Sequence, residues 1–146
     1  MQEAREKFFD YLARKKLKST TQRGTIFDVF WSVEDHVSPE ELYGLVKKKD
    51  PSIGQATVYR TLKLLSESKI AREVDFGDGV TRYEPYYGQS HHDHIICQTC
   101  DKRLEVVDER IEQLQEELAK KHDFTLNSHS MYLFGQCREC RESKQA

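Results

Sequence analysis

The chain has 146 residues, of which 37% are hydrophobic and 33% are charged, and its formal net charge is −2. This length suffices for one compact domain or two small ones, and the modest apolar content implies a thin or divided core. No apolar run approaches the ~20 residues of a membrane-spanning helix, and the N-terminus lacks the features of a signal peptide, so we expect a cytoplasmic protein that does not enter membranes.

Charge is distributed unevenly along the first half of the chain. Residues 1–23 contain seven basic and three acidic side chains, and residues 47–72 contain seven basic and two acidic ones. Residues 24–46 between them contain five acidic side chains and no basic one. Two positive patches separated by an acidic stretch favour a local polyanion site, although most such runs are simply solvated helix faces.

Apolar residues at helical spacing predict four helices, within residues 2–17, 19–33, 38–51 and 52–70. Ser19 and Gln22 have the spacing of a capping box at the start of the second helix. Ser38 and Glu41 have the same spacing at the start of the third helix, where Pro39 occupies the first helical position.

The fourth helix has one apolar and one polar face. Val58, Leu62 and Leu65 would form its buried stripe. Its outward side chains would be Gln55, Thr57, Arg60 and Thr61.

Residues 70–85 then change to short β-branched and aromatic runs around Asp78-Gly79, which predict a β-hairpin. Helices followed by a terminal hairpin predict a winged helix over residues 1–84. A small helical domain with an incidental hairpin is the alternative, but the basic outward face of the fourth helix favours DNA binding.

Residues 85–90, PYYGQS, predict a hinge between this domain and a second one over residues 91–146. The second domain should contain strands at 92–98 and 103–108, a helix at 108–122 and a long strand at 124–137. Ile111, Leu114 and Leu118 of the helix should face inward. The fold class is therefore α+β, and a metal and a partner subunit would both compensate for the small core of the second domain.

All four cysteines lie in two Cys-x-x-Cys pairs, Cys97/Cys100 and Cys137/Cys140. Two such pairs supply the four thiolates of a closed, tetrahedral and non-catalytic Zn²⁺ site. A redox dithiol normally needs only one pair, at a helix N-terminus, so the pattern favours structural zinc.

The stretch HHDH, residues 91–94, immediately precedes the first cysteine pair. In an extended strand His92 and His94 would point to one side, and His91 and Asp93 to the other, which predicts two sites rather than one. Further ligands would come from Glu105, Glu112 and His129. Nitrogen and oxygen ligands suit Fe²⁺, Mn²⁺, Co²⁺ or Zn²⁺.

The chain resembles the ferric uptake regulator (Fur) family along nearly its whole length, through the segments DHVSPEELY, IGQATVYRTLKLL, HHDHIICQTC and HSMYLFGQCREC. The resemblance implies a homodimeric, metal-dependent transcriptional regulator and not an enzyme. It would have an N-terminal winged-helix DNA-binding domain and a C-terminal α/β dimerisation domain. Its partner would be double-stranded DNA carrying an A/T-rich inverted repeat, and assembly into a tetramer is left open.

The resemblance also implies three sets of metal ligands. Structural Zn²⁺ would bind Cys97, Cys100, Cys137 and Cys140. The regulatory site would comprise His36, Glu84, His92, His94 and Glu105. An additional site would comprise His91, Asp93, Glu112 and His129.

For DNA, the resemblance implies that Tyr59 and Arg60 contact bases and backbone. Gln55 and Thr57 share the outward face of the same predicted helix. Lys18 matches a lysine that enters the minor groove, and Arg23 is expected to contact phosphate.

Peroxide-sensing relatives usually carry Asp near Glu84 and at the position of Glu105, so Glu at both favours the iron-responsive type, a repressor of metal-uptake genes. The regulatory ion would be Fe²⁺ or Mn²⁺, with Zn²⁺ as an alternative in vitro. Peroxide sensing is the next interpretation. Outside the family, the residues leave a small zinc hydrolase or a metal buffer, although Ile96 rather than Pro precedes Cys97, unlike nucleobase deaminases.

Overall fold

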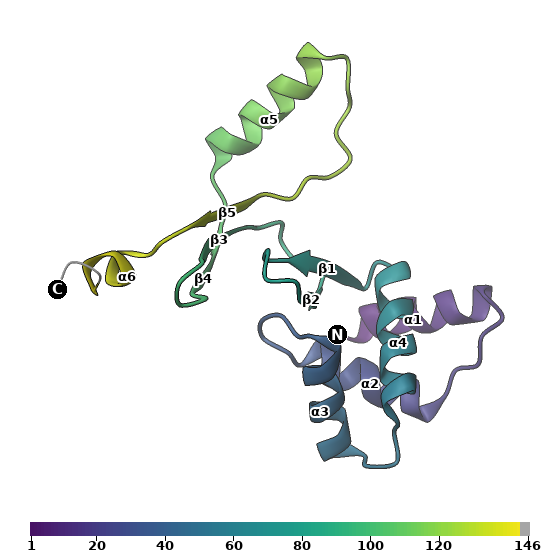
Figure 1. The fold of residues 1–146 in the computed structure, drawn as a ribbon. Helices are drawn as coiled ribbons and strands as arrows, with labels where there is room; N and C mark the ends of the chain where they lie inside the picture. Colours follow the sequence, from purple (N-terminus) through teal and green to yellow (C-terminus); the bar gives the residue numbers. More distant parts are fainter. Residues whose placement is uncertain (144–146) are drawn as a thin grey trace. The chain divides into compact units, whose positions relative to one another are not determined.

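The structure, a computed structural model, describes residues 1–143, which form two compact units (Figure 1). The first unit runs from Met1 to Gln89, and the second begins at Ser90. Both units mix helices and strands, which agrees with the predicted α+β class. Within the described residues, no helix has the length and apolar character needed to cross a membrane.

The first unit contains α1 (Gln2–Arg14), α2 (Thr21–Trp31), α3 (Pro39–Lys49), α4 (Gln55–Glu67), β1 (Ala71–Asp75) and β2 (Thr81–Pro85). The four helices lie where apolar periodicity predicts them. The capping box of Ser38 and Glu41 is confirmed, with Pro39 at the first helical position. At α2 the predicted cap is wrong by one residue, because Thr20 rather than Ser19 accepts the backbone N–H of Arg23.

Aromatic and aliphatic side chains from all four helices form the core of the first unit. Phe8, Phe27 and Phe30 are fully buried, and the Phe8 and Phe27 rings stack with centroids 5.9 Å apart. The predicted stripe of Val58, Leu62 and Leu65 on α4 is buried in this core.

Thr61 corrects the prediction for the outward face of α4, because it is only 1% exposed. Val58, Leu62 and Leu65 surround it on the helical wheel, so it shares their buried face.

Strands β1 and β2 pair antiparallel, from Ala71 opposite Pro85 to Asp75 opposite Thr81. The hairpin is confirmed, and its loop spans residues 76–80, with Gly77 and Gly79 both at φ +77°. A β-bridge between Val37 and Tyr83 joins the segment before α3 to β2 through N–O distances of 2.9 and 2.8 Å. The bridge brings the neighbouring residues 36 and 84 together.

The second unit contains β3 (Asp93–Cys97), β4 (Arg103–Val106), α5 (Glu109–Lys121), β5 (Tyr132–Gly135) and α6 (Arg138–Ser143). Its sheet has the order β4-β3-β5, with β4 antiparallel and β5 parallel to β3. The long strand predicted over residues 124–137 is wrong, because only four of these residues pair with the sheet. The short helix α6 was not predicted.

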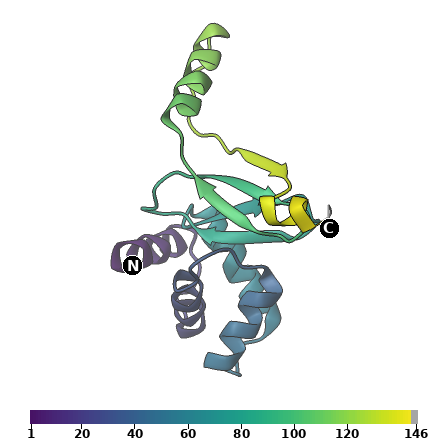
Figure 2. The same cartoon turned by 90° about the vertical axis from the view of Figure 1, so that its left-hand side faces the viewer.

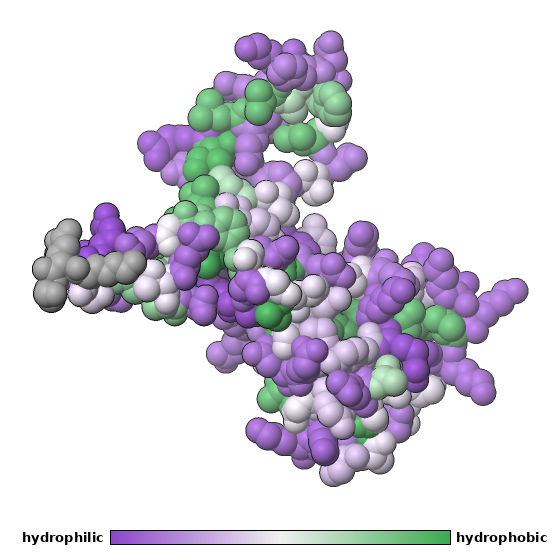
Figure 3. Space-filling model, viewed as in Figure 1, coloured by the Kyte–Doolittle hydropathy of each residue, from purple (hydrophilic) through white to green (hydrophobic). Residues whose placement is uncertain are grey.

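Helix α5 does not bury its apolar stripe within the described chain. Leu114 and Leu118 are 62% and 60% exposed, which contradicts the expectation that they face inward. Extended segments connect α5 to the sheet, and the helix stands away from the strands in both views (Figures 1 and 2). Hydrophobic residues consequently lie on the surface of α5 and its connecting segments (Figure 3).

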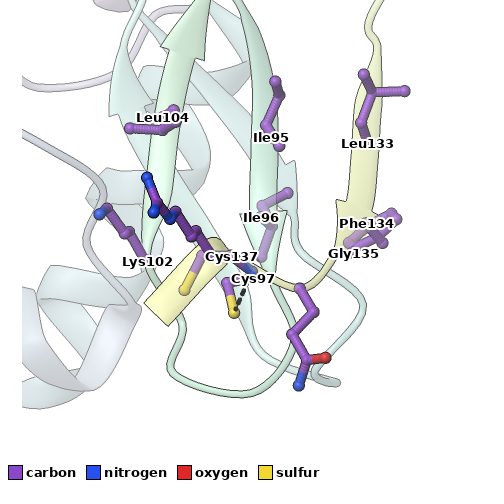
Figure 4. Close-up of a pocket in the computed structure, with 11 residues that line it drawn as sticks. Ile95, Ile96, Cys97, Lys102, Leu104, Leu133, Phe134, Gly135 and Cys137 are labelled. Atoms are coloured by element: carbon purple, nitrogen blue, oxygen red, sulfur yellow. Dashed lines mark hydrogen bonds between the residues drawn. The ribbon is translucent and has the colours of Figure 1, made fainter. Parts of the chain in front are cut away.

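The sheet of the second unit also exposes an apolar row. Ile95 pairs with Leu104 on one side and with Leu133 on the other, so the three side chains cross the sheet side by side (Figure 4). Each of them remains between 38% and 49% exposed. Within the described residues of this unit, one face of the sheet therefore stays partly exposed.

Candidate metal centres and nucleic-acid interface

The four cysteines converge at one end of the sheet in the second unit. Cys97 ends β3, Cys100 follows in the turn before β4, and the other pair, Cys137 and Cys140, lies at the start of α6. The four sulfur atoms all lie within 4.8 Å of one another, and none of the four cysteines forms a disulfide. The strand–helix–strand excursion between the pairs thus returns the chain to the same point.

The spacing of these sulfurs fits a tetrahedral zinc ion. A Zn–S bond of ~2.3 Å in tetrahedral geometry places sulfurs about 3.8 Å apart. Cys100 Sγ and Cys137 Sγ lie 3.8 Å apart. The backbone N–H of Cys137 also donates to Cys97 Sγ at 3.4 Å (Figure 4), an arrangement that stabilises a thiolate.

The thiols differ in acidity. Backbone N–H groups, that of Cys137 foremost, lower the pKa of Cys97 to about 6. Hydrogen bonds with Cys137 and Cys100 raise the pKa of Cys140 to about 12. The cluster therefore holds at least one thiolate near neutral pH, and binding of a metal would release protons from the remaining thiols.

A second cluster comprises His91, Asp93, Glu112 and His129, whose ligand atoms lie within 4.8 Å of one another. Nε2 of His91 and Nε2 of His129 lie 3.3 and 3.2 Å from Glu112 Oε1. Asp93 is 1% exposed, and one of its oxygens accepts the backbone N–H of Met131 at 3.1 Å. A buried carboxylate beside two imidazoles requires a compensating positive charge, which a divalent cation can supply.

On the other side of β3, His92 and His94 lie together, with ring centroids 4.9 Å apart. Nε2 of His92 lies 3.7 Å from Glu105 Oε1, and Glu105 pairs with His94 in the β3–β4 register. The ring of Tyr132 stacks on His94 at 5.4 Å with an interplanar angle of 7°. Tyr132 was not singled out from the sequence, since only the β3–β5 register places it there.

In the first unit, the Val37–Tyr83 bridge places His36 beside Glu84. Nε2 of His36 lies 3.0 Å from Glu84 Oε2, and Nδ1 lies beside the Asp35 carboxylate. Glu84 also accepts from Arg72 Nε at 3.0 Å. Burial, the largest influence, raises the pKa of Glu84, but hydrogen bonds from His36 and Arg72 outweigh it and lower the pKa to about 2.

The candidate regulatory ligands therefore form two groups. One group, His36 and Glu84, belongs to the first unit, and the other, His92, His94 and Glu105, belongs to the second. Both groups contain imidazole nitrogen and carboxylate oxygen donors, the set that borderline divalent ions such as Fe²⁺ and Mn²⁺ accept. Sequence reasoning did not identify Asp35 or Arg72 as neighbours of this set.

Helix α4 presents the candidate nucleic-acid interface. Arg60 and Gln55 are exposed, and Thr57 and Tyr59 are half-buried. The helix begins after Gly54, with no side-chain cap, so its first backbone N–H groups can donate to a phosphate oxygen. In the first turn of α2, the guanidinium of Arg23 donates to the backbone carbonyl of Lys18, which lies in the loop before the helix.

Sequence reasoning missed a residue beside this interface. Glu40, in the first turn of α3, accepts a hydrogen bond from the Tyr59 hydroxyl at 2.8 Å. Gln55 Nε2 donates to the same hydroxyl at 3.1 Å. Glu40 belongs to an acidic stretch, and only the packing of α3 against α4 reveals its contact.

Comparison with known proteins shows consistent similarity over most of the chain. A profile of the ferric uptake regulator family matches residues 14–134. A ferric uptake regulation protein of Campylobacter jejuni is 38% identical over 141 residues, which cover 95% of this chain and 89% of that protein.

Two solved structures extend the comparison to the fold. The ferric uptake regulator of Helicobacter pylori, described as having three functional metal-binding sites, superposes with a TM-score of 0.85 at 34% identity over 98% of this chain and 95% of that one. A peroxide stress regulator of Campylobacter jejuni superposes with a TM-score of 0.70 at 30% identity over 90% of this chain and 98% of that one.

Proposed function

The chain belongs to the ferric uptake regulator family, and from this premise we propose that it represses metal-uptake genes in response to intracellular iron. Members of the family are metal-responsive transcription regulators that bind DNA and form dimers, and they are not enzymes. The small zinc hydrolase and the metal buffer considered from the sequence are thereby set aside. We place the protein in the cytoplasm, where its operators and its metal supply are found.

The division of the candidate regulatory ligands between the two units carries the proposal. His36 and Glu84 lie in the unit that contains α4, and His92, His94 and Glu105 lie in the unit that contains the sheet. A divalent ion would be bound by ligands from both units at once. Residues 85–90 would act as the hinge, residues 1–84 as the DNA-binding domain and residues 91–146 as the dimerisation domain.

Glu84 is suited to its part in this site before any ion is bound. Its lowered pKa keeps the carboxylate ionised, and Arg72 and His36 hold it in place. Ligands held in advance lose little conformational entropy on binding, so more of the binding free energy remains to orient the two domains. By linkage, the operator must raise metal affinity by the same factor by which the metal raises operator affinity.

Iron is the favoured signal because Glu stands at positions 84 and 105, and because the Campylobacter jejuni relative is a ferric uptake regulation protein. Fe²⁺ or Mn²⁺ would occupy the regulatory site, with Zn²⁺ as an alternative in vitro. Similarity to the peroxide stress regulator keeps peroxide sensing as the second candidate. Oxidation of His36 or His92 by peroxide in the Fe²⁺-loaded protein, seen as a mass increase in peptides, would favour that candidate.

Zinc at the four cysteines would have a structural role. The sulfur spacing and the thiolate character of Cys97 support this assignment, and a four-sulfur shell leaves no open position for a substrate. The second cluster, His91, Asp93, Glu112 and His129, would form an additional metal site.

A second copy of the chain would cover the apolar row of Leu104, Ile95 and Leu133, together with the exposed leucines of α5. In that dimer two copies of α4 would enter successive major grooves, so the operator should be an inverted repeat. Lys18 would favour a narrow, A/T-rich minor groove, where the negative potential is strongest.

The decisive experiment measures operator affinity during titration of the purified dimer with Fe²⁺, Mn²⁺ or Zn²⁺. We expect a gain of about 5–150-fold, which corresponds to ~1–3 kcal/mol of coupling. His92→Ala should abolish the gain and retain the cysteine-bound zinc. His122→Ala, a histidine of the same unit outside all three ligand sets, is the matched control and should behave as the wild type. Equal operator affinity with and without added metal, at full zinc occupancy, would overturn the proposal.

A further inference from the structure

A hydrogen-bonded chain of three side chains crosses from α3 to the start of α4. Gln55 is the first residue of α4, and Tyr59 follows it one turn later on the same face. Gln55 Nε2 donates to the Tyr59 hydroxyl at 3.1 Å, and this hydroxyl donates to Glu40 Oε1 at 2.8 Å. Two of the three residues belong to the candidate DNA-contacting face, whereas Glu40 belongs to a different helix.

The pKa values of Glu40 and Tyr59 shift in opposite directions. The pKa of Glu40 is lowered because its carboxylate accepts a hydrogen bond from its own backbone N–H and another from Tyr59. For Tyr59, the hydrogen bond from Gln55 lowers the pKa, but Glu40 and burial together raise it. An ionised carboxylate therefore faces a neutral hydroxyl near neutral pH, and the carboxylate can only accept.

This arrangement determines which way the Gln55 amide is turned. The Tyr59 hydroxyl has a single proton, and it donates that proton in its hydrogen bond to Glu40. Towards Gln55 the same oxygen can only accept, so the amide must direct its NH₂ group, and not its Oε1, at Tyr59. Oε1 and the second N–H then remain available on the outer side of α4.

We propose that Glu40 is a specificity-determining positioning residue, which holds the Gln55 amide in the orientation that pairs with adenine rather than guanine. Adenine offers an N6 donor and an N7 acceptor in the major groove, and an amide with one oxygen and one N–H outward matches both. Guanine offers only the N7 and O6 acceptors. The inference rests on the proposed function, because it requires α4 to lie in the major groove.

Loss of the acceptor at position 40 has a defined consequence. The Tyr59 hydroxyl proton becomes free to donate to Gln55 Oε1, and the amide can turn its NH₂ group outward. That group presents two donors, which match guanine. The change alters base preference at one position of each half-site, whereas a purely structural defect would weaken binding to every DNA sequence alike.

The test selects preferred sequences from a randomised duplex library, using full-length protein loaded with Mn²⁺. Wild type should prefer adenine to guanine by about tenfold at one position of each half-site. Glu40→Leu, which removes both charge and acceptor, should reduce this ratio to near one. Tyr59→Phe, which removes the hydroxyl from the other helix, should reduce the ratio at the same position.

Glu40→Gln is the matched control, because it removes the same charge and retains a carbonyl acceptor. It should bind all duplexes more tightly, to the same extent as Glu40→Leu, and should keep the adenine preference. Loss of the preference in Glu40→Gln as complete as in Glu40→Leu would overturn the inference, as would an unchanged ratio in all variants. A wild-type protein that selects no sequence with metal bound would instead refute the proposed function, and this inference with it.

Discussion

The two units of the chain differ in what holds them together. The first unit buries Phe8, Phe27 and Phe30 completely and has a continuous apolar core. The second unit has a three-stranded sheet, and among its described residues it buries Asp93 and His94 beside only three hydrophobic residues, Ile96, Cys97 and Ala119. Apolar burial thus stabilises the first unit, whereas the second has few buried apolar side chains and contains two clusters of possible metal ligands.

The difference indicates how a regulator can respond to metal without unfolding its DNA-binding part. Because the first unit has its own apolar core, we expect α4 to stay intact with and without metal. The second unit has few buried apolar side chains. Its conformation is therefore the one that metal binding can change most.

Cys137→Ser should have the largest effect, and the effect should be confined to the second unit. Structural zinc contributes roughly 10–16 kcal/mol to the folding of small zinc domains, so loss of one ligand should unfold this unit and dissociate the dimer. Hydrogen exchange resolved by peptide should show loss of protection in β3, β4 and β5. Protection in α1 to α4 should be unchanged.

Phe27→Ala is the reciprocal change in the first unit. Truncation of a fully buried Phe costs about 3–5 kcal/mol, because transfer free energy is lost and a cavity remains. Trp31, in α2, is the only tryptophan of the chain, so its fluorescence during urea unfolding reports on the first unit alone. Zinc content should stay at the wild-type value. Release of zinc in Phe27→Ala would show that the two units are not independent.

The same difference between the units determines which features can be predicted from the sequence. In the first unit the capping box at Ser38 and the buried stripe of α4 follow from local spacing, and both are confirmed. Periodicity identifies an apolar face but not what covers it, so Leu114 and Leu118 were wrongly expected to face inward. Even in the first unit, the cap at Thr20 was missed, because adjacent hydroxyl residues offer the same chemistry.

Contacts between elements distant in sequence could not be predicted from spacing. His36 approaches Glu84 through the Val37–Tyr83 bridge, and Glu40 meets Tyr59 through helix packing. The cysteine pairs were assigned to one site because their chemistry requires four sulfurs, and this assignment needed no knowledge of the path between them.

Leu133→Glu tests whether exposed apolar side chains have different roles in the two units. A charge in the apolar row should be buried in the dimer and should weaken dimerisation by at least about 2 kcal/mol, or roughly 30-fold. Sedimentation equilibrium of the zinc-loaded protein measures this change. Leu45→Glu is the matched control, because Leu45 is 42% exposed in the first unit against 45% for Leu133. Equal dimerisation constants for the two variants would show that this face is not the interface.

Ser38→Ala should have the smallest effect, again confined to the first unit. The Ser38 hydroxyl accepts the backbone N–H of Glu41 at 3.2 Å, and the Glu41 carboxylate accepts the N–H of Ser38 at 2.8 Å. Loss of an N-cap costs ~1 kcal/mol, so the urea midpoint followed by Trp31 should fall slightly while zinc content and dimerisation stay constant. Ser66→Ala, inside α4, should be neutral or slightly stabilising, because Ala has the higher helix propensity. A weaker dimer in Ser38→Ala would contradict the independence of the two units, because this cap lies entirely within the first.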